Sequence, residues 1–205
     1  MKRKIIALFG GTFDPIHLGH TTVAQAAADH LAADRLVFIP VKQSPLKNVS
    51  PVASEMQRLE MIKLALGTHD RFDLSDFEVN GPVPSYTLHT VKHFRERFGA
   101  ACSLHWLVGA DAVQGLARWY GVSELLSLCS LSVMYRAGCE TPDFSGFERI
   151  WGQVYTDKLK RQVIPTPLIP VSSTEVRNKI RRGDALGESL APGVCAYIKE
   201  KELYR

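Results

Sequence analysis

The fold is decided by one stretch, Gly10-Gly11-Thr12-Phe13-Asp14-Pro15-Ile16-His17-Leu18-Gly19-His20. It follows a short apolar run, Ile5 to Phe9, and precedes an Ala-rich segment, which is typical of a strand that ends at a glycine turn and continues into a helix. His17 and His20 stand three positions apart where that helix begins, so both rings can lie on one face beside free backbone N–H groups. The stretch therefore predicts a binding site for phosphate.

A second strand is expected soon after this helix. Thr21 to Leu31 carries apolar residues at helical spacing, and Arg35 to Pro40 is an apolar run that ends at a proline. A strand, a helix and a strand in this order form a βαβ unit, which requires a parallel sheet and a right-handed crossover. The first loop should therefore lie at the carboxyl end of the sheet, where such folds bind ligands.

The rest of the chain continues this alternation. Further strands are expected at 72–77, 103–108, 131–135 and, as an edge strand, 163–171. Helices are expected at 54–66, 85–98, within 112–128, and at 144–160, 172–182 and 192–203. The pattern predicts an α/β fold, a Rossmann-like doubly wound parallel sheet in a single domain over residues 1–205, with a C-terminal helical portion from about residue 172.

Composition narrows the class of protein. The 205 residues are 45% hydrophobic and 22% charged, which suits one soluble domain with a substantial core. The net charge of +4 favours anionic small molecules and argues against nucleic acid as a partner. No apolar run is long enough for a membrane span. The oligomeric state stays open, and a homo-oligomer is compatible with the sequence.

The cysteines indicate a reducing compartment. They are widely spaced and contain no Cys-x-x-Cys pair, so neither a zinc site nor a disulfide framework is expected. The cytoplasm is therefore the expected location. The four positions are Cys102, Cys129, Cys139 and Cys195.

The phosphate site belongs to neither of the two common glycine-rich types. The sequence around Gly10 lacks the Gly-Lys-Ser or Gly-Lys-Thr of a Walker A loop, and it also lacks the Gly-x-Gly-x-x-Gly fingerprint. The helix N-terminus with His17 and His20 would meet the phosphate instead. The alternative, two capping or surface histidines, is disfavoured by the nearby glycines, which allow close approach of a ligand. Asp14 is interpreted as a turn residue that fixes the loop, because an ionised phosphate needs no catalytic base.

Two motifs carry a resemblance to a known superfamily. Gly11-Thr12-Phe13-Asp14-Pro15 with His17-x-Gly19-His20 resembles the nucleotidyltransferases, whose shared loop has the form His-x-Gly-His, and Ser172-Ser173-Thr174-x-x-Arg177 resembles their second phosphate motif. The whole arrangement is similar to the bacterial nicotinate-nucleotide adenylyltransferase family. The resemblance covers nearly the whole chain and is weakest from 138 to 162. Its further features are Ser85-Tyr86-Thr87, Gly109-Ala110-Asp111, Trp119-Tyr120, Tyr197-Ile198 and Leu203-Tyr204.

The resemblance implies a reaction and a set of ATP contacts. ATP and nicotinate mononucleotide would give nicotinate adenine dinucleotide and pyrophosphate, with Mg²⁺ bound to the ATP phosphates and no metal ligands from the protein. The mononucleotide phosphate would attack the α-phosphorus directly, so no protein nucleophile is implied. The implied catalytic residues are His17, His20 and Arg177. The implied ATP-binding residues are these three with Gly11, Thr12, Phe13, Gly109, Asp111, Ser173 and Thr174.

The resemblance also implies how the acceptor is held. Thr87 and the backbone of Tyr120 would bind the pyridine carboxylate, and Trp119 would stack on the ring. Lys47 would reach a phosphate from the loop Ser44-Pro45-Leu46-Lys47, in which Leu46 replaces the histidine of the family's Pro-x-His-Lys motif.

Other interpretations remain open at this stage. Asp111 and Thr87 could serve only as helix caps, and Trp119 could be a core aromatic residue. His89 and His93 have the spacing of metal ligands on a helix, but no third ligand is evident and a solvated face is favoured. Alternative functions are adenylyl transfer to nicotinamide mononucleotide or another acceptor such as phosphopantetheine, and a non-catalytic nucleotide-sensing module.

Overall fold

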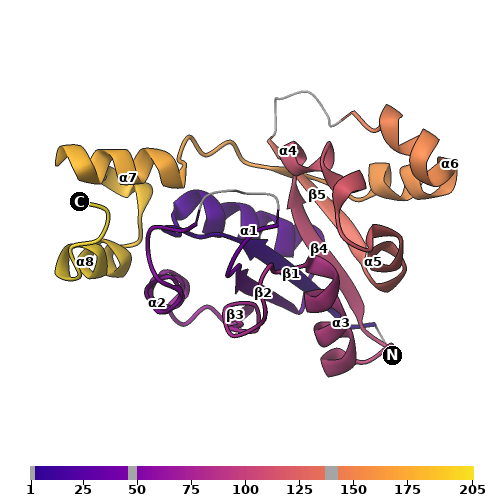
Figure 1. Ribbon diagram of the computed structural model, residues 1–205, viewed down its shortest axis with the longest axis horizontal. Helices are drawn as coiled ribbons and strands as arrows, with labels where there is room; N and C mark the ends of the chain where they lie inside the picture. Colours follow the sequence, from indigo (N-terminus) through magenta and orange to yellow (C-terminus); the bar gives the residue numbers. More distant parts are fainter. Residues whose placement is uncertain (1–2, 46–49, 137–142) are drawn as a thin grey trace.

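A six-stranded parallel sheet forms the centre of the computed structural model, which describes residues 3–45, 50–136 and 143–205 (Figure 1). The strands are β1 (Ile5–Gly11), β2 (Arg35–Pro40), β3 (Phe72–Leu74), β4 (Ser103–Gly109), β5 (Ser130–Arg136) and β6 (Val163–Thr166). Their order across the sheet is β3-β2-β1-β4-β5-β6, and each neighbouring pair is parallel. This is the doubly wound order, in which the direction of winding reverses between β1 and β4. The predicted fold class is confirmed.

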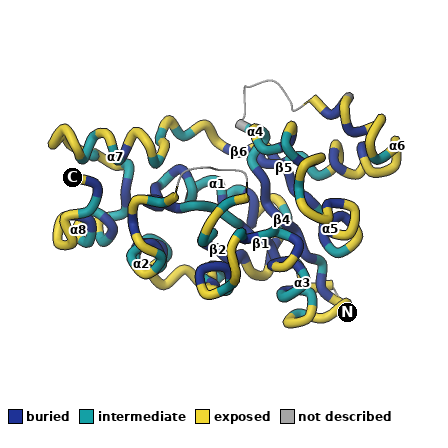
Figure 2. The backbone as a smooth tube through the Cα atoms, in the orientation of Figure 1, coloured by how far each residue is buried: buried dark blue, intermediate teal, exposed yellow. Residues whose placement is uncertain are grey.

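Helices cover both faces of the sheet. The α-helices are α1 (Leu18–His30), α2 (Glu55–Leu66), α3 (Thr87–Phe98), α4 (Ala110–Val113), α5 (Val122–Leu128), α6 (Ser145–Arg161), α7 (Ser173–Arg182) and α8 (Pro192–Glu200). Two short 3₁₀ turns are η1 (Leu116–Arg118) and η2 (Gly187–Ser189). In Figure 2 the buried strands lie between helices whose outer surfaces are exposed.

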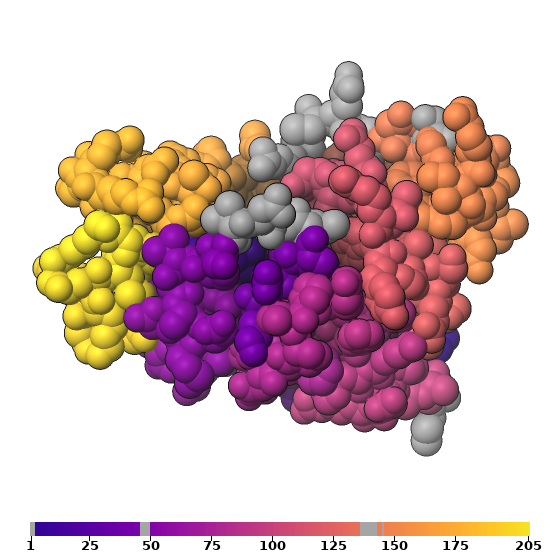
Figure 3. All heavy atoms as spheres, viewed as in Figure 1, coloured from indigo at the N-terminus to yellow at the C-terminus, as the bar shows by residue number. Residues whose placement is uncertain are grey.

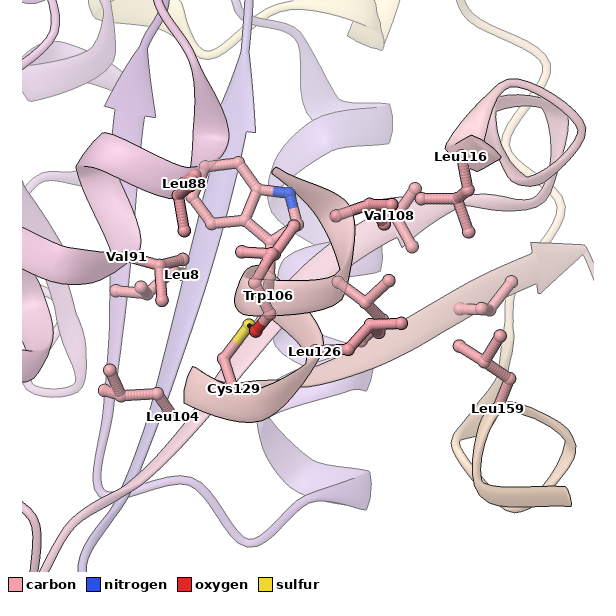
Figure 4. Packing of buried hydrophobic residues seen from close by; sticks show 14 of the residues in the cluster. Leu8, Leu88, Val91, Leu104, Trp106, Val108, Leu116, Leu126, Cys129 and Leu159 are labelled. Atoms are coloured by element: carbon pink, nitrogen blue, oxygen red, sulfur yellow. Dashed lines mark hydrogen bonds between the residues drawn. The ribbon is translucent and has the colours of Figure 1, made fainter. Parts of the chain in front are cut away.

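The core has two layers, one on each face of the sheet. Along β1, Ile6 and Leu8 pack on the face covered by α3, α5 and α6, whereas Ala7 and Phe9 pack on the face covered by α1, α2, α7 and α8. Parallel strands that are buried on both faces require such continuous apolar runs. Figure 4 shows the first layer, where the indole of Trp106 lies beside Leu88.

Helix starts and stops follow the capping residues that the sequence supplies. Ser54 and Gln57 form a capping box at the start of α2, and the Ser172 side chain accepts a hydrogen bond from the Glu175 N–H at the start of α7. Gly183 ends α7 with a left-handed φ of 71°, which costs glycine little. These local signals explain why the helices occur where the sequence predicts them.

The differences from prediction lie at element ends. α1 begins at Leu18, within the His17–His20 segment where its start was predicted, and His17 is its N-cap residue. β3 and β6 are shorter than predicted, and β6 stops at Thr166 because prolines follow and cannot donate to a neighbouring strand. α8 ends at Glu200 rather than at residue 203. Within the described residues, no helix is long and apolar enough to cross a bilayer.

The C-terminal helices return to the first half of the chain. α8 packs against α2, and Figure 3 shows its yellow surface directly against the purple surface of that region. Near the end of the chain, Tyr204 is buried in the same layer as α1 and α2. This return brings the second sequence motif, on α7, to the loop that follows β1.

Candidate active site

The two histidines of the first motif lie together at the start of α1. His17 is the N-cap residue, with extended backbone angles, and His20 belongs to the first turn. The His17 backbone N–H donates to Nδ1 of His20 at 3.2 Å, and the two rings stack with their centroids 3.7 Å apart. Because Nδ1 of His20 accepts, the neutral ring carries its proton on Nε2. His20 therefore presents an N–H donor.

His17 is held as an uncharged ring. Its side chain is buried, with 7% exposed, and burial lowers its pKa from 6.5 to about 4. Its Nδ1 atom has no hydrogen-bond partner among the described residues. A Cβ atom at Gly19 would lie 2.9 Å from that nitrogen, so glycine gives the ring its place across the first turn. Near neutral pH, His17 can contribute hydrogen bonds but no positive charge.

The lowered pKa of His17 predicts a loss of stability in acid. Below pH 6.5 the unfolded chain binds a proton at this residue and the folded chain does not, so stability falls as the pH drops from 6.5 to about 4. We expect the free energy of unfolding of His17→Gln to fall about 2 kcal/mol less than that of the wild type between pH 7 and pH 5. Urea titrations at both pH values measure this difference. If the free energy of unfolding fell equally with pH in both proteins, His17 would not be buried as a neutral ring. His30→Gln, which changes an exposed histidine, is the control.

The second motif contacts the first directly. Arg177 donates from Nη1 to the carbonyl of Asp14 at 2.6 Å and from Nη2 to Oγ1 of Thr174 at 3.2 Å. Ser173 donates from Oγ to the carbonyl of Pro15 at 3.0 Å. Residues more than 150 positions apart thus form one wall of the loop that leads into α1. The structure brings the predicted pair of phosphate motifs together.

A cavity of about 550 Å³ opens beside this loop, at the carboxyl ends of β1 and β4. This is the point where the sheet's winding reverses, the usual ligand site of doubly wound folds. Six residues that the sequence nominated line it: Gly11, Thr12, Thr87, Gly109, Trp119 and Tyr120. The cavity thus unites the proposed adenosine and pyridine contacts.

The walls of the cavity are largely aromatic. Trp106 lies across Gly10, where an added Cβ atom would come within 2.5 Å of the indole. Trp119 lines the cavity and packs on the core beneath it, and its Nε1 has no partner among the residues that the structure describes. Thr87 is the first residue of α3 and Tyr86 is the cap residue, so the interpretation of Thr87 as the helix cap is wrong.

Some nominated residues lie outside the cavity lining. The Phe13 ring is buried and meets the His20 ring edge-on at 5.0 Å, so only the Phe13 backbone could touch a ligand. Asp111 is exposed in the first turn of α4, whose cap residue is Gly109, so it does not cap that helix. Lys47 and Leu46 lie outside the described residues.

Two charged lining residues were not expected from the sequence. Arg118 is exposed at the cavity, directly before Trp119-Tyr120. Glu78 is buried, accepts a hydrogen bond from Oγ1 of Thr90 at 2.6 Å, and has a pKa that burial raises to about 7. Arg118 could have been predicted as a site residue from its position next to Trp119-Tyr120. The sequence around Glu78 contains no comparable signal.

Metal ligation by side chains is not evident in the described ranges, which contain no group of three or more His, Cys, Asp or Glu suited to a metal ion. The His93 ring stacks on Phe77 at 4.0 Å, and the His89 ring lies edge-on to Tyr86 and Tyr120. These contacts account for both rings of the i,i+4 pair.

Comparison with known proteins agrees with this geometry. Proteins named "Probable nicotinate-nucleotide adenylyltransferase" from Methylacidiphilum infernorum and Clostridium tetani are 35% identical over 202 residues and 34% identical over 207 residues. The alignments cover 97% and 100% of this chain and 91% and 100% of those proteins.

Solved structures show the same fold. Nicotinic acid mononucleotide adenylyltransferase of Plasmodium falciparum, complexed with NaAD, superposes with a TM-score of 0.74 at 18% identity and covers 98% of this chain and 97% of that one. A family model described as cytidylyltransferase-like matches residues 8–179, a range that contains both predicted phosphate motifs. The chain belongs to the cytidylyltransferase-like family.

Proposed function

We propose that this protein transfers the adenylyl group of ATP to nicotinate mononucleotide. The observation that carries the proposal is the contact between Arg177 and the Asp14 carbonyl, which joins two phosphate motifs at the edge of an aromatic-walled cavity. Phosphate groups would lie at the motifs and the two ring systems in the cavity. The full-length relatives named for this activity support the assignment.

The chemistry is a direct displacement at phosphorus. A phosphate oxygen of the mononucleotide forms a bond to the α-phosphorus of ATP, the bond from that phosphorus to the bridging oxygen breaks, and pyrophosphate leaves with the electron pair. The acceptor is already ionised, so the protein's task is alignment and charge stabilisation. Nε2–H of His20 would donate to the α-phosphate as charge develops. Arg177, with Ser173 and Thr174, would hold the departing β- and γ-phosphates.

We propose Mg²⁺ as the accompanying metal ion, carried by the ATP phosphates. The loop from Gly11 to His20 offers backbone N–H groups and imidazoles, which suit anionic oxygens, while Mg²⁺ prefers oxygen ligands such as phosphates. When bound, the ion would neutralise charge on the phosphates. The carboxylate of Asp14, the one acidic group in that stretch, is bonded to Val52, Ala53 and Tyr204, so the ATP phosphates would supply the ligands.

We also propose the cytoplasm as the site of the reaction. Cys102, Cys129 and Cys195 are free thiols, as is usual in a reducing compartment, and Cys139 lies outside the described residues. Both proposed substrates are soluble nucleotides.

Pyrophosphate release tests the proposed function. Purified protein is assayed with ATP and Mg²⁺ and, in separate reactions, nicotinate mononucleotide, nicotinamide mononucleotide or phosphopantetheine. We expect the highest kcat/KM with nicotinate mononucleotide. Absence of turnover with that acceptor would overturn the proposal, and ATP binding without turnover on any acceptor would favour a nucleotide-sensing module.

The nicotinamide acceptor is the second candidate, and the charge of the cavity argues against it. Arg118 is the one Lys or Arg among the described residues that line the cavity. It is the last residue of η1 and directly precedes Trp119. Glu78, the one lining carboxyl group in the described ranges, is buried and has a raised pKa, so its charge is partly suppressed near neutral pH. The mouth of the cavity therefore favours an anionic ring substituent.

Arg118→Gln is expected to reduce discrimination between the two acceptors. Loss of the guanidinium should lower kcat/KM for nicotinate mononucleotide about tenfold, because its carboxylate would contact this cation. The kcat/KM for nicotinamide mononucleotide, which has no such carboxylate, should stay within about twofold of the wild-type value. Steady-state assays with both acceptors measure the ratio. Arg149→Gln removes the same charge from the exposed surface of α6 and is the control. If kcat/KM fell equally with both acceptors, Arg118 would instead contact the phosphate group that the two mononucleotides share.

A further inference from the structure

The loop between β1 and α1, which we propose binds phosphate, is contacted by Tyr204 near the end of the chain. Tyr204, the penultimate residue, donates from its hydroxyl to Oδ1 of Asp14 at 2.7 Å. The same carboxylate accepts the backbone N–H groups of Val52, at 2.7 Å to Oδ2, and Ala53, at 3.0 Å to Oδ1. Asp14 thus joins three segments that are distant in sequence, which confirms its predicted role of fixing the loop.

The backbone of Tyr204 adopts an unfavourable conformation at this contact. Its ring is buried, with 4% exposed, and its φ is +68°, in the left-handed region that non-glycine residues rarely adopt. Phe13, next to Asp14, has a φ of +47° and is likewise buried. The unfavourable backbone of Tyr204, and of Phe13 next to its acceptor Asp14, indicates that the surrounding structure holds this contact in place.

A buried cation supports the same loop. Arg58 of α2 is 0% exposed, and its Nη1 donates to the carbonyls of Thr12 at 2.9 Å and Val41 at 2.7 Å. Burial lowers the pKa of Arg58, and the nearby charge of Asp14 opposes that shift. By bonding two backbone carbonyls at once, the buried guanidinium holds the loop after β1 and the residue after β2 in one arrangement.

Asp14 connects this support to the reacting side of the loop. Its carboxylate is bound by Tyr204, while its carbonyl oxygen accepts from Arg177, the cation assigned to the leaving phosphates. Ser173 binds the next carbonyl, that of Pro15. His17, two residues later, is the N-cap residue of α1. A displacement of Asp14 would therefore change the position of His17 and His20 relative to Arg177.

We propose that Tyr204 is a positioning residue for adenylyl transfer, acting through Asp14 on the alignment of His20 and Arg177. This inference rests on the proposed function. Without the hydroxyl, Oδ1 of Asp14 keeps only the Ala53 N–H, and the loop gains freedom at the point where the two motifs meet. Transition-state alignment is more sensitive to such freedom than ground-state binding in the cavity, which Tyr204 does not line.

Tyr204→Phe tests the proposal, because it keeps the ring and removes the hydroxyl. We expect kcat to fall about tenfold while the KM for the mononucleotide changes less than twofold. The matched control is Tyr197→Phe on α8, because Tyr197 is half-buried in the same core layer and its hydroxyl makes no hydrogen bond to the loop within the described residues. A kcat within twofold of the wild type, with only a lowered melting temperature, would overturn the positioning role.

Amide hydrogen exchange separates failure of this proposal from failure of the proposed function. Tyr204→Phe should exchange faster than the wild type over residues 12–20 and 52–53, and Tyr197→Phe should not. This readout needs no substrate. Absence of wild-type turnover would overturn the proposed function, whereas unchanged exchange over those residues in an active wild type would overturn the positioning role and leave the function standing.

Discussion

Replacement of His20 by alanine is expected to lower kcat by about 10²- to 10³-fold, the usual effect of removing one donor to a transition state. Nδ1 of His20 accepts from the His17 N–H, so the ring is held with its proton on Nε2. A donor fixed in this way needs little reorganisation when negative charge develops on the α-phosphate. The KM values for both substrates should change much less, because the interaction strengthens only in the transition state.

Two conservative variants make this prediction specific. A Gln amide at position 20 can place a donor near the site of Nε2, whereas an Asn amide reaches only the site of Nδ1, so His20→Gln should retain more activity than His20→Asn or His20→Ala. His30→Ala, at the exposed end of α1, is the control and should leave kcat unchanged. A loss smaller than tenfold in His20→Ala would remove His20 from this role.

The sheet and the position of the loop after β1 could be predicted because their signals are local. The apolar run from Ile5 to Phe9, the glycines after it and the capping residue Ser54 each act within a few residues of the backbone that they shape. The βαβ unit then fixed the end of the sheet where the loop must lie. Strand ends were less predictable, because they depend on the neighbouring strand available for pairing.

The support behind the loop could not be predicted in the same way. Asp14 and Tyr204 are 190 positions apart, and their contact depends on the return of α8 to α2. Arg58 occurs in a segment whose composition suits an exposed helix face, yet it is fully buried by the loop above it. Such long-range contacts leave no periodicity in the sequence. The charge state of His17 depends on burial and was hidden for the same reason.

Arg177→Gln is expected to lower kcat/KM for ATP about 100-fold. Arg177 holds the Asp14 carbonyl through Nη1, at 2.6 Å, so its planar guanidinium is oriented before any phosphate arrives. Charge-assisted contacts of arginine to phosphate contribute about 1.5–3 kcal/mol each, and the glutamine amide replaces neither the charge nor the forked geometry. Initial rates at varied ATP and saturating mononucleotide measure the effect.

A lysine at this position distinguishes charge from geometry. The single ammonium group of Arg177→Lys cannot reproduce the rigid fork that binds the Asp14 carbonyl and a phosphate together, so we expect it to recover less than a tenth of the lost kcat/KM. Arg181→Gln, one turn further along α7 and bonded to Asn178, should behave as the wild type. If lysine restored full activity, Arg177 would act as a positive charge alone, and its contact with the first motif would be incidental to catalysis.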